Sequence, residues 1–188
     1  MRINYKGNYS QITTAVEDAN DVLNSEEFYT LITQHGDFNC SDFSSEKIAN
    51  IIKNSKLEVE VKIYKPRLRY RKVLGYFVKN RPNNIFLNSR KIYRDTNSIT
   101  NTIVHEYIHA VDNSNKSEIQ FGHNCGSFDN TAPYIIGSYA ELLIEGNDVN
   151  EISTLQKKNF TGLQSMCLTE EKDGEKSDIF YVEDHRMI

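Results

Sequence analysis

The sequence is poor in several residues and runs that mark particular classes of protein. Its 188 residues include three prolines, three cysteines and no tryptophan. The cysteines, Cys40, Cys125 and Cys167, form no Cys-x-x-Cys pair, which excludes a four-cysteine zinc ribbon. An odd number of cysteines at irregular spacing is not typical of a disulfide framework, so we expect free thiols in a reducing compartment.

Long apolar segments are missing as well. No run approaches the roughly 20 apolar residues that a membrane-spanning helix needs. The N-terminal stretch MRINYKGNYSQITTAVEDAN lacks the apolar centre of a signal peptide. We expect a soluble protein with no membrane span, either cytoplasmic or exported without a recognisable signal peptide. The sequence does not indicate an oligomeric state.

The chain does contain enough apolar material for a folded domain. Hydrophobic residues make up 38% of it and charged residues 26%, a balance that argues against global disorder. We expect one compact domain with three parts, which are an N-terminal helical segment packed on the core (1–56), the core itself (57–150) and a polar, partly mobile C-terminal tail (151–188).

The periodicity of apolar residues predicts an α+β fold. Helical intervals or helix-bounding residues mark four stretches: 13–34, 45–55, 99–112 and 133–146. Alternating or β-prone composition marks three stretches between them: 57–64, 67–79 and 85–88. This order predicts N-terminal helices, a small, mostly antiparallel sheet of about three to four strands, and two further helices.

The motif that carries chemistry is His-Glu-Tyr-Ile-His at residues 105–109, inside an expected helix. Positions four apart share one face of a helix, so His105 and His109 can each offer a ring nitrogen to a single Zn²⁺. Glu106 would project beside the metal and reach a water in the open coordination position. The surrounding residues TIVHEYIHAV carry no charge outside the motif, as expected of a helix that is buried on its other faces.

Two imidazoles do not complete a catalytic zinc site, which usually has three protein ligands and a water. Three residues downstream are candidates for the third ligand. His123 follows Gly122, which permits a tight approach, and imidazole is a common zinc ligand. Glu141, on the next expected helix, is the main alternative, and Asp112 is better suited to accept a hydrogen bond from a ligand N–H.

These residues give the chain a resemblance to the zincin metallopeptidases, over roughly Leu57 to Gly146. The resemblance rests on IFLN (85–88), the segment TIVHEYIHAV and the later Gly122-His123. The last pair loosely resembles the SprT-like proteins, whose third ligand is a histidine in a Gly-His-Gly context. Here Asn124 follows His123, and the cysteine-rich C-terminal zinc module of many SprT-like proteins is missing. The resemblance implies a mixed sheet whose edge strand lines a substrate cleft, with the motif helix beneath it.

The activity so implied is peptide hydrolysis by a zinc-activated water, with Glu106 as general base and one zinc per chain. Tyr134 and Tyr139 are candidate donors to the oxyanion. A peptide could add as a strand along Ile85, Phe86, Leu87 and Asn88, taken as the sheet edge. The alternatives are hydrolysis of a non-peptide amide, or a non-catalytic zinc-binding interaction module.

Charge is distributed unevenly along the chain. Residues 61–94 contain eleven Lys or Arg and no Asp or Glu, whereas the rest carries eleven basic and all 26 acidic residues. This segment could be a solvated sheet face, a rim that attracts an acidic protein or peptide substrate, or a surface covered by the acidic stretch 169–178. The net charge of −4 and the lack of a binding motif argue against nucleic acid as a partner.

Overall fold

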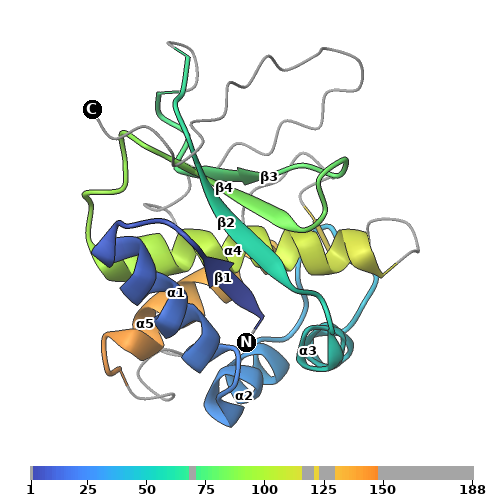
Figure 1. Ribbon diagram of the computed structural model, residues 1–188. Coiled ribbons are helices and arrows are strands. Elements are labelled where there is room, and N and C mark those ends of the chain that lie inside the picture. Colours follow the sequence, from blue (N-terminus) through green and yellow to red (C-terminus); the bar gives the residue numbers. More distant parts are fainter. Residues whose placement is uncertain (1, 68–70, 116–120, 123–129, 148–188) are drawn as a thin grey trace.

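The structure is a computed structural model that describes residues 2–67, 71–115, 121–122 and 130–147. Within this part of the chain, five helices lie on one side of a four-stranded sheet (Figure 1). In chain order the elements are β1 (Ile3–Tyr5), α1 (Ser10–Val22), α2 (Glu26–Gln34), α3 (Ser45–Asn54), β2 (Val59–Tyr64), β3 (Gly75–Phe77), β4 (Asn84–Asn88), α4 (Thr96–Ser114) and α5 (Ala132–Ile144). The α+β class is confirmed.

The sheet has the strand order β1-β2-β4-β3. β1 pairs with β2 and β2 pairs with β4 in parallel, and only β3 and β4 are antiparallel. The prediction of a mostly antiparallel sheet was therefore wrong. The cause is that β4 lies between β2 and β3, so these two consecutive strands are not neighbours in the sheet. An alternation of apolar and polar residues does not indicate that a later strand is inserted between two earlier ones.

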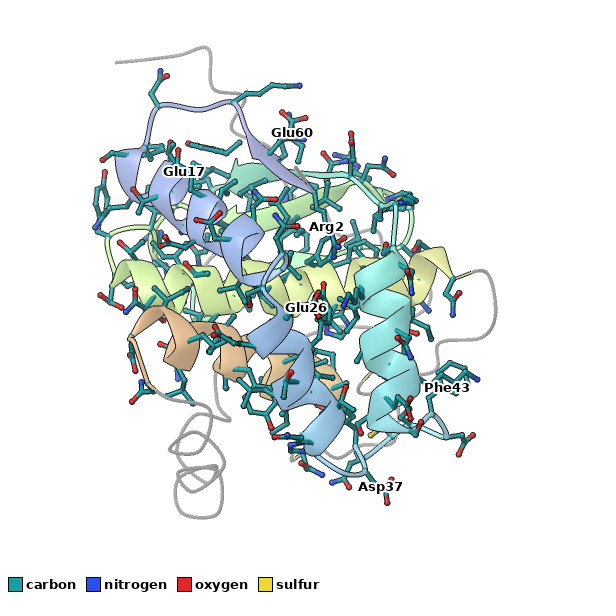
Figure 2. All side chains as sticks on the ribbon, turned by 90° about the horizontal axis from the view of Figure 1, so that it is seen from below. Arg2, Glu17, Glu26, Asp37, Phe43 and Glu60 are labelled. Carbon is teal, nitrogen blue, oxygen red and sulfur yellow. The ribbon has the colours of Figure 1, made fainter. Side chains whose placement is uncertain are left out.

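The N-terminal residues belong to the same sheet and core. β1, which the sequence pattern did not predict, is held by the side chain of Asn20 on α1. That amide donates to the Ile3 carbonyl at 2.9 Å and accepts from the Ile3 and Arg2 backbone N–H groups at 3.1 and 2.9 Å. The Arg2 guanidinium donates to the Tyr29 hydroxyl and to the Ile52 carbonyl, which ties α2 to α3 (Figure 2).

The expected single helix over residues 13–34 is two helices. The first ends at Val22, and the Ser25 side chain then accepts a hydrogen bond from the Phe28 N–H and so caps α2. Acidic residues Glu26 and Glu27 follow in the first turn, where they suit the helix dipole. The apolar spacing continues across the break because both helices pack on the same core.

α4 is the central helix of the fold. It contacts α1, α3 and α5 on its helical sides and β3 and β4 on its sheet side. It begins after Asp95, whose carboxylate accepts hydrogen bonds from the Asn97 and Ser98 N–H groups and so caps the helix. None of the described helices is long and apolar enough to cross a membrane.

Cys40 corrects the expectation of free thiols. It is disulfide-bonded, and its partner lies outside the described residues. With three cysteines one thiol is left over, but the other two can still pair. The expectation from the number and spacing of the cysteines did not allow for such a single disulfide. The expected tail (151–188), with its acidic stretch, also lies outside the described residues.

Candidate metal centre

α4 brings His105, Glu106 and His109 together as the motif predicts. The imidazole rings of the two histidines have centroids 5.0 Å apart at an interplanar angle of 63°. One ligand atom from each of the three residues lies within 4.8 Å of the others, and no other such group occurs in the described part of the chain. Two imidazoles one helical turn apart, with a carboxylate beside them, are suited to hold a single transition-metal ion.

The burial of these residues follows from the position of α4. His105 and Glu106 are each 1% exposed, and His109 is half-buried. On the sheet side, Phe77 of β3 lies near the Glu106 carboxylate, and on the other side Tyr134 of α5 lies against His105. These contacts cover His105 and Glu106 more completely than His109.

Glu106 is a buried titratable group whose surroundings disfavour its charge. Neither oxygen of its carboxylate has a hydrogen-bond partner among the residues that the structure describes. Burial raises its pKa to about 8, and the nearby backbone N–H of Phe77, which does not reach hydrogen-bond geometry, opposes that shift only weakly. Burial and the charge of Glu106 also raise the pKa of Tyr64 on β2. A buried unpartnered carboxylate destabilises a fold unless something else occupies the site.

α5 approaches α4 unusually closely beside the histidines, and Gly137 makes this approach possible. A Cβ at this position would lie 2.6 Å from the Asn101 side-chain oxygen, 3.0 Å from the Asn101 carbonyl oxygen and 3.3 Å from the His105 Cβ. One turn earlier on α5, the Tyr134 ring packs edge-on against His105 with centroids 4.6 Å apart. The two contacts fix the position of His105 on the side that faces α5.

Replacing Gly137 with Ala is expected to destabilise the protein by about 1–3 kcal/mol, because the new methyl group would displace the Asn101 side chain and crowd the Asn101 carbonyl oxygen. The gain in helix propensity, about 1 kcal/mol, does not compensate for the clash. Urea unfolding measures the change. The control is Glu145→Ala at the exposed end of α5, which should stay within about 0.5 kcal/mol of the wild type. An unchanged Gly137→Ala variant would show that α4 and α5 are farther apart than described.

The structure separates the candidates for the third ligand. The Glu141 carboxylate accepts from the Asn101 side chain at 2.6 Å, one turn before His105, and does not join the group formed by the two histidines and Glu106. Asp112 is buried, and its carboxylate accepts from the Phe121 backbone N–H at 3.4 Å. His123 lies outside the described residues, two positions after Phe121.

The two candidate tyrosines are placed differently. Tyr134 lies against His105, whereas the Tyr139 hydroxyl lies 2.7 Å from Nδ1 of His35 at the end of α2. Nε2 of His35 lies 2.6 Å from the Asn130 side-chain oxygen, so the half-buried His35 belongs to a polar network with Tyr139 and Asn130. Of the two tyrosines, Tyr134 is the one that the structure brings to the motif.

The predicted substrate edge at Ile85–Asn88 was wrong. β4 pairs with β2 on one side and β3 on the other, so it lies inside the sheet. β3 is the edge strand next to α4, and the backbone of its residue Phe77 lies near the Glu106 carboxylate. Asn88 instead donates from its side chain to the Val73 carbonyl at 2.6 Å, which fixes the chain that enters β3.

No known protein family, curated protein or solved structure matches this chain. Its function is therefore inferred from the site. The sequence pattern missed three elements of the site, which are the β3 edge, the Asn101–Glu141 contact and the close approach at Gly137. Only the last had a sequence signal, since a glycine inside an apolar helical pattern often marks a close helix contact.

Proposed function

We propose that this chain is a zinc-dependent metallopeptidase in which His105 and His109 bind the metal and Glu106 is the general base. The observation that carries the proposal is the Glu106 carboxylate, buried beside two imidazoles without a hydrogen-bond partner among the described residues. A structural zinc site has no use for such a group, whereas a hydrolytic site needs one next to its water. A bound cation would also offset the cost of burying the negative charge.

Two imidazoles and a water are donors that Zn²⁺ prefers, and a third protein ligand completes a catalytic site. We propose His123 for that position. Asp112, which lies one turn beyond His109 on α4, supports this choice because its carboxylate accepts a hydrogen bond from the Phe121 N–H. Gly122, which follows Phe121 in the sequence and precedes His123, is buried. Glu141, the alternative, is supported less because its carboxylate is engaged by Asn101.

The protein's own groups then have distinct roles in the proposed reaction. When bound, zinc lowers the pKa of a coordinated water and polarises the carbonyl of the bond to be cleaved. Glu106 accepts a proton from the water as the water oxygen attacks the carbonyl carbon. Glu106 then delivers that proton to the leaving nitrogen as the C–N bond breaks. Tyr134, against His105, is the proposed donor to the oxyanion. The low-polarity surroundings of Glu106 keep competing water away from its carboxylate.

The peptide is proposed to bind along β3. In the antiparallel pair, Asn88 N–H donates to the Leu74 carbonyl, so the backbone groups of Tyr76 face β4 and those of Gly75 and Phe77 face outward. These outward groups lie on the side of Glu106, and an extended peptide could pair with them as an added strand.

The test is cleavage of unfolded casein by the zinc-loaded protein, followed by mass spectrometry of the products. New peptide termini are expected with the wild type, and none after chelation of zinc or with Glu106→Gln. Cleavage of a small non-peptide amide in place of casein would favour the hydrolase of that class. Bound zinc with no hydrolysis of either substrate would overturn the proposal and favour a non-catalytic zinc-binding module.

A further inference from the structure

The connection between α2 and α3, labelled at Asp37 in Figure 2, contains the disulfide-bonded Cys40. This connection is attached to the residues that precede α5. The Asn39 N–H donates to the Asn130 carbonyl at 2.8 Å, and the Asn130 side chain donates to the Asp37 carbonyl at 2.9 Å. Asn39 also forms a parallel bridge with Thr131, which is buried. Cys40 therefore lies one residue from the point where the two segments meet.

The end of α2 strengthens the same attachment. Nε2 of His35 lies 2.6 Å from the Asn130 side-chain oxygen, and Nδ1 of the same ring lies 2.7 Å from the Tyr139 hydroxyl on α5. The connection between α2 and α3 thus supports the first turns of α5, and from the first of these Tyr134 contacts His105. The position of this connection therefore bears directly on the candidate metal centre.

The partner of Cys40 is either Cys125 or Cys167, since the sequence has three cysteines, and both candidates lie outside the described residues. Cys125 is five residues before Asn130, so at most about 18 Å of chain separates it from the residue that the α2–α3 connection holds. Cys167 is twenty residues beyond Asn147, which follows α5. A disulfide needs Cα atoms about 4.4–6.8 Å apart, and the entropy lost in bringing them together grows with the length of the intervening chain. The shorter connection favours Cys125.

Cys125 is two residues after His123, the proposed third ligand. Ahead of His123 the chain is attached to α4, because the Asp112 carboxylate accepts a hydrogen bond from the Phe121 N–H at 3.4 Å. A disulfide between Cys125 and Cys40 would attach the same stretch behind His123. A ligand held on both sides loses less conformational entropy when it binds a metal, so its affinity for the metal is higher.

From this placement we propose that Cys40 is paired with Cys125 and that this disulfide holds His123 at the motif, so that tight zinc binding requires the oxidised protein. The inference rests on the proposed function for the role of His123 as a ligand. A dithiol reductant would reverse it, because the S–S bond breaks, two thiols form with two electrons and two protons from the dithiol, and the dithiol becomes a disulfide. Such a bond persists in oxidising surroundings, so the proposal assigns the zinc-loaded protein to an oxidising compartment.

The pairing is tested by peptide mapping of the full-length protein after refolding in a glutathione redox buffer. The three cysteines lie in different tryptic peptides, which are 7–47, 117–157 and 159–172. After alkylation of free thiols and digestion without reductant, we expect the first two peptides to be linked and Cys167 to be alkylated. Linkage of Cys40 to Cys167, or alkylation of all three cysteines, would overturn the proposal. This measurement uses only the wild type, so it decides the pairing even where a variant does not fold.

The effect on the site is tested by titration of zinc in competition with a chromogenic chelator. Cys40→Ser and Cys125→Ser should each lower the affinity for zinc on the order of tenfold and the melting temperature by about 5–15 °C. The double variant should be no weaker than either single variant, because both remove the same bond. The matched control is Cys167→Ser, which should leave both quantities unchanged. A lower melting temperature with unchanged zinc affinity would show that the disulfide stabilises only the fold, and would overturn its role at the site.

This inference and the proposed function fail in different ways. Zinc affinity that falls in Cys40→Ser, without peptide cleavage by the wild type, would leave the disulfide's role standing and remove the peptidase. Peptide cleavage and zinc affinity that are both unchanged in Cys40→Ser would leave the peptidase standing and remove the inference. A correctly paired wild type that binds no zinc would remove both.

Discussion

Replacing Glu106 with Gln is expected to lower the rate of peptide hydrolysis by about 10²–10⁴-fold while zinc remains bound. The amide keeps the shape of the side chain but cannot accept the proton of the attacking water, and general-base catalysis contributes about this factor. His105 and His109 are untouched, so zinc content should match the wild type. Steady-state cleavage of a labelled peptide measures the loss, and an active Glu106→Gln protein with the same zinc content would contradict the assigned role.

The same substitution has an expected effect on the metal-free protein, through the pKa of Glu106. Because the folded-state pKa is raised from 4.5 to about 8, folding is favoured when the group is protonated. Its contribution to stability is complete below the unfolded pKa and is lost as pH rises through the folded pKa. Relative to Gln, the wild type should lose about 3 kcal/mol of unfolding free energy between pH 4.5 and pH 7.

Urea unfolding of both proteins in chelator, at several pH values, checks this difference. The free-energy cost of burying the Gln amide does not vary with pH, so it does not affect the change with pH of the difference between the two proteins. A difference between the two proteins that stays constant over this range would mean that Glu106 is solvated or hydrogen-bonded in the folded state.

Zinc is expected to raise the stability of the wild type strongly and that of His109→Ala hardly at all. A ligand that binds only the folded state at a thousandfold excess over its dissociation constant stabilises by about 4 kcal/mol. For a chain of this size that corresponds to a rise in melting temperature of about 10 °C. Loss of one of two described imidazoles removes most of the affinity, so the shift should vanish in His109→Ala.

His35→Gln is the matched histidine control for this measurement. His35 contacts Tyr139 and Asn130 rather than the motif, so its loss should lower the starting melting temperature through broken hydrogen bonds and leave the zinc-induced shift intact. Magnesium should give no shift in any of the proteins, since it prefers oxygen ligands. A zinc shift that survives in His109→Ala would place the metal elsewhere.

The sequence was informative where local patterns determine structure. The helices α3, α4 and α5 and the strands β2 and β4 lie within a few residues of the predicted stretches, because each has a regular apolar period and a bounding residue. β1 could not be found, since three residues without a clear period become a strand only by pairing with β2 and bonding to Asn20. The direction of the pairings also depends on where β4 inserts, which is a long-range property.

The same division applies to the site. The spacing of His105, Glu106 and His109 is a property of one helix, so the sequence alone was enough to predict that they meet. Which strand forms the sheet edge beside Glu106 depends on the order of the strands, which the sequence does not reveal. For this reason the substrate-binding edge was predicted at β4, whereas the edge strand is β3. The roles of Glu141 and Tyr139 depend on partners on other elements, Asn101 and His35, which no local pattern relates to them.

The most direct test of the metal site is elemental analysis of zinc in the purified full-length wild type and in His109→Ala, His123→Ala and Glu141→Ala. We predict about one zinc per chain in the wild type and in Glu141→Ala, and none in His109→Ala or His123→Ala. Zinc lost with Glu141 and kept without His123 would reassign the third ligand and leave the metallopeptidase proposal in place. Absence of zinc from the wild type, even after zinc is added and the excess removed, would contradict the account at its centre.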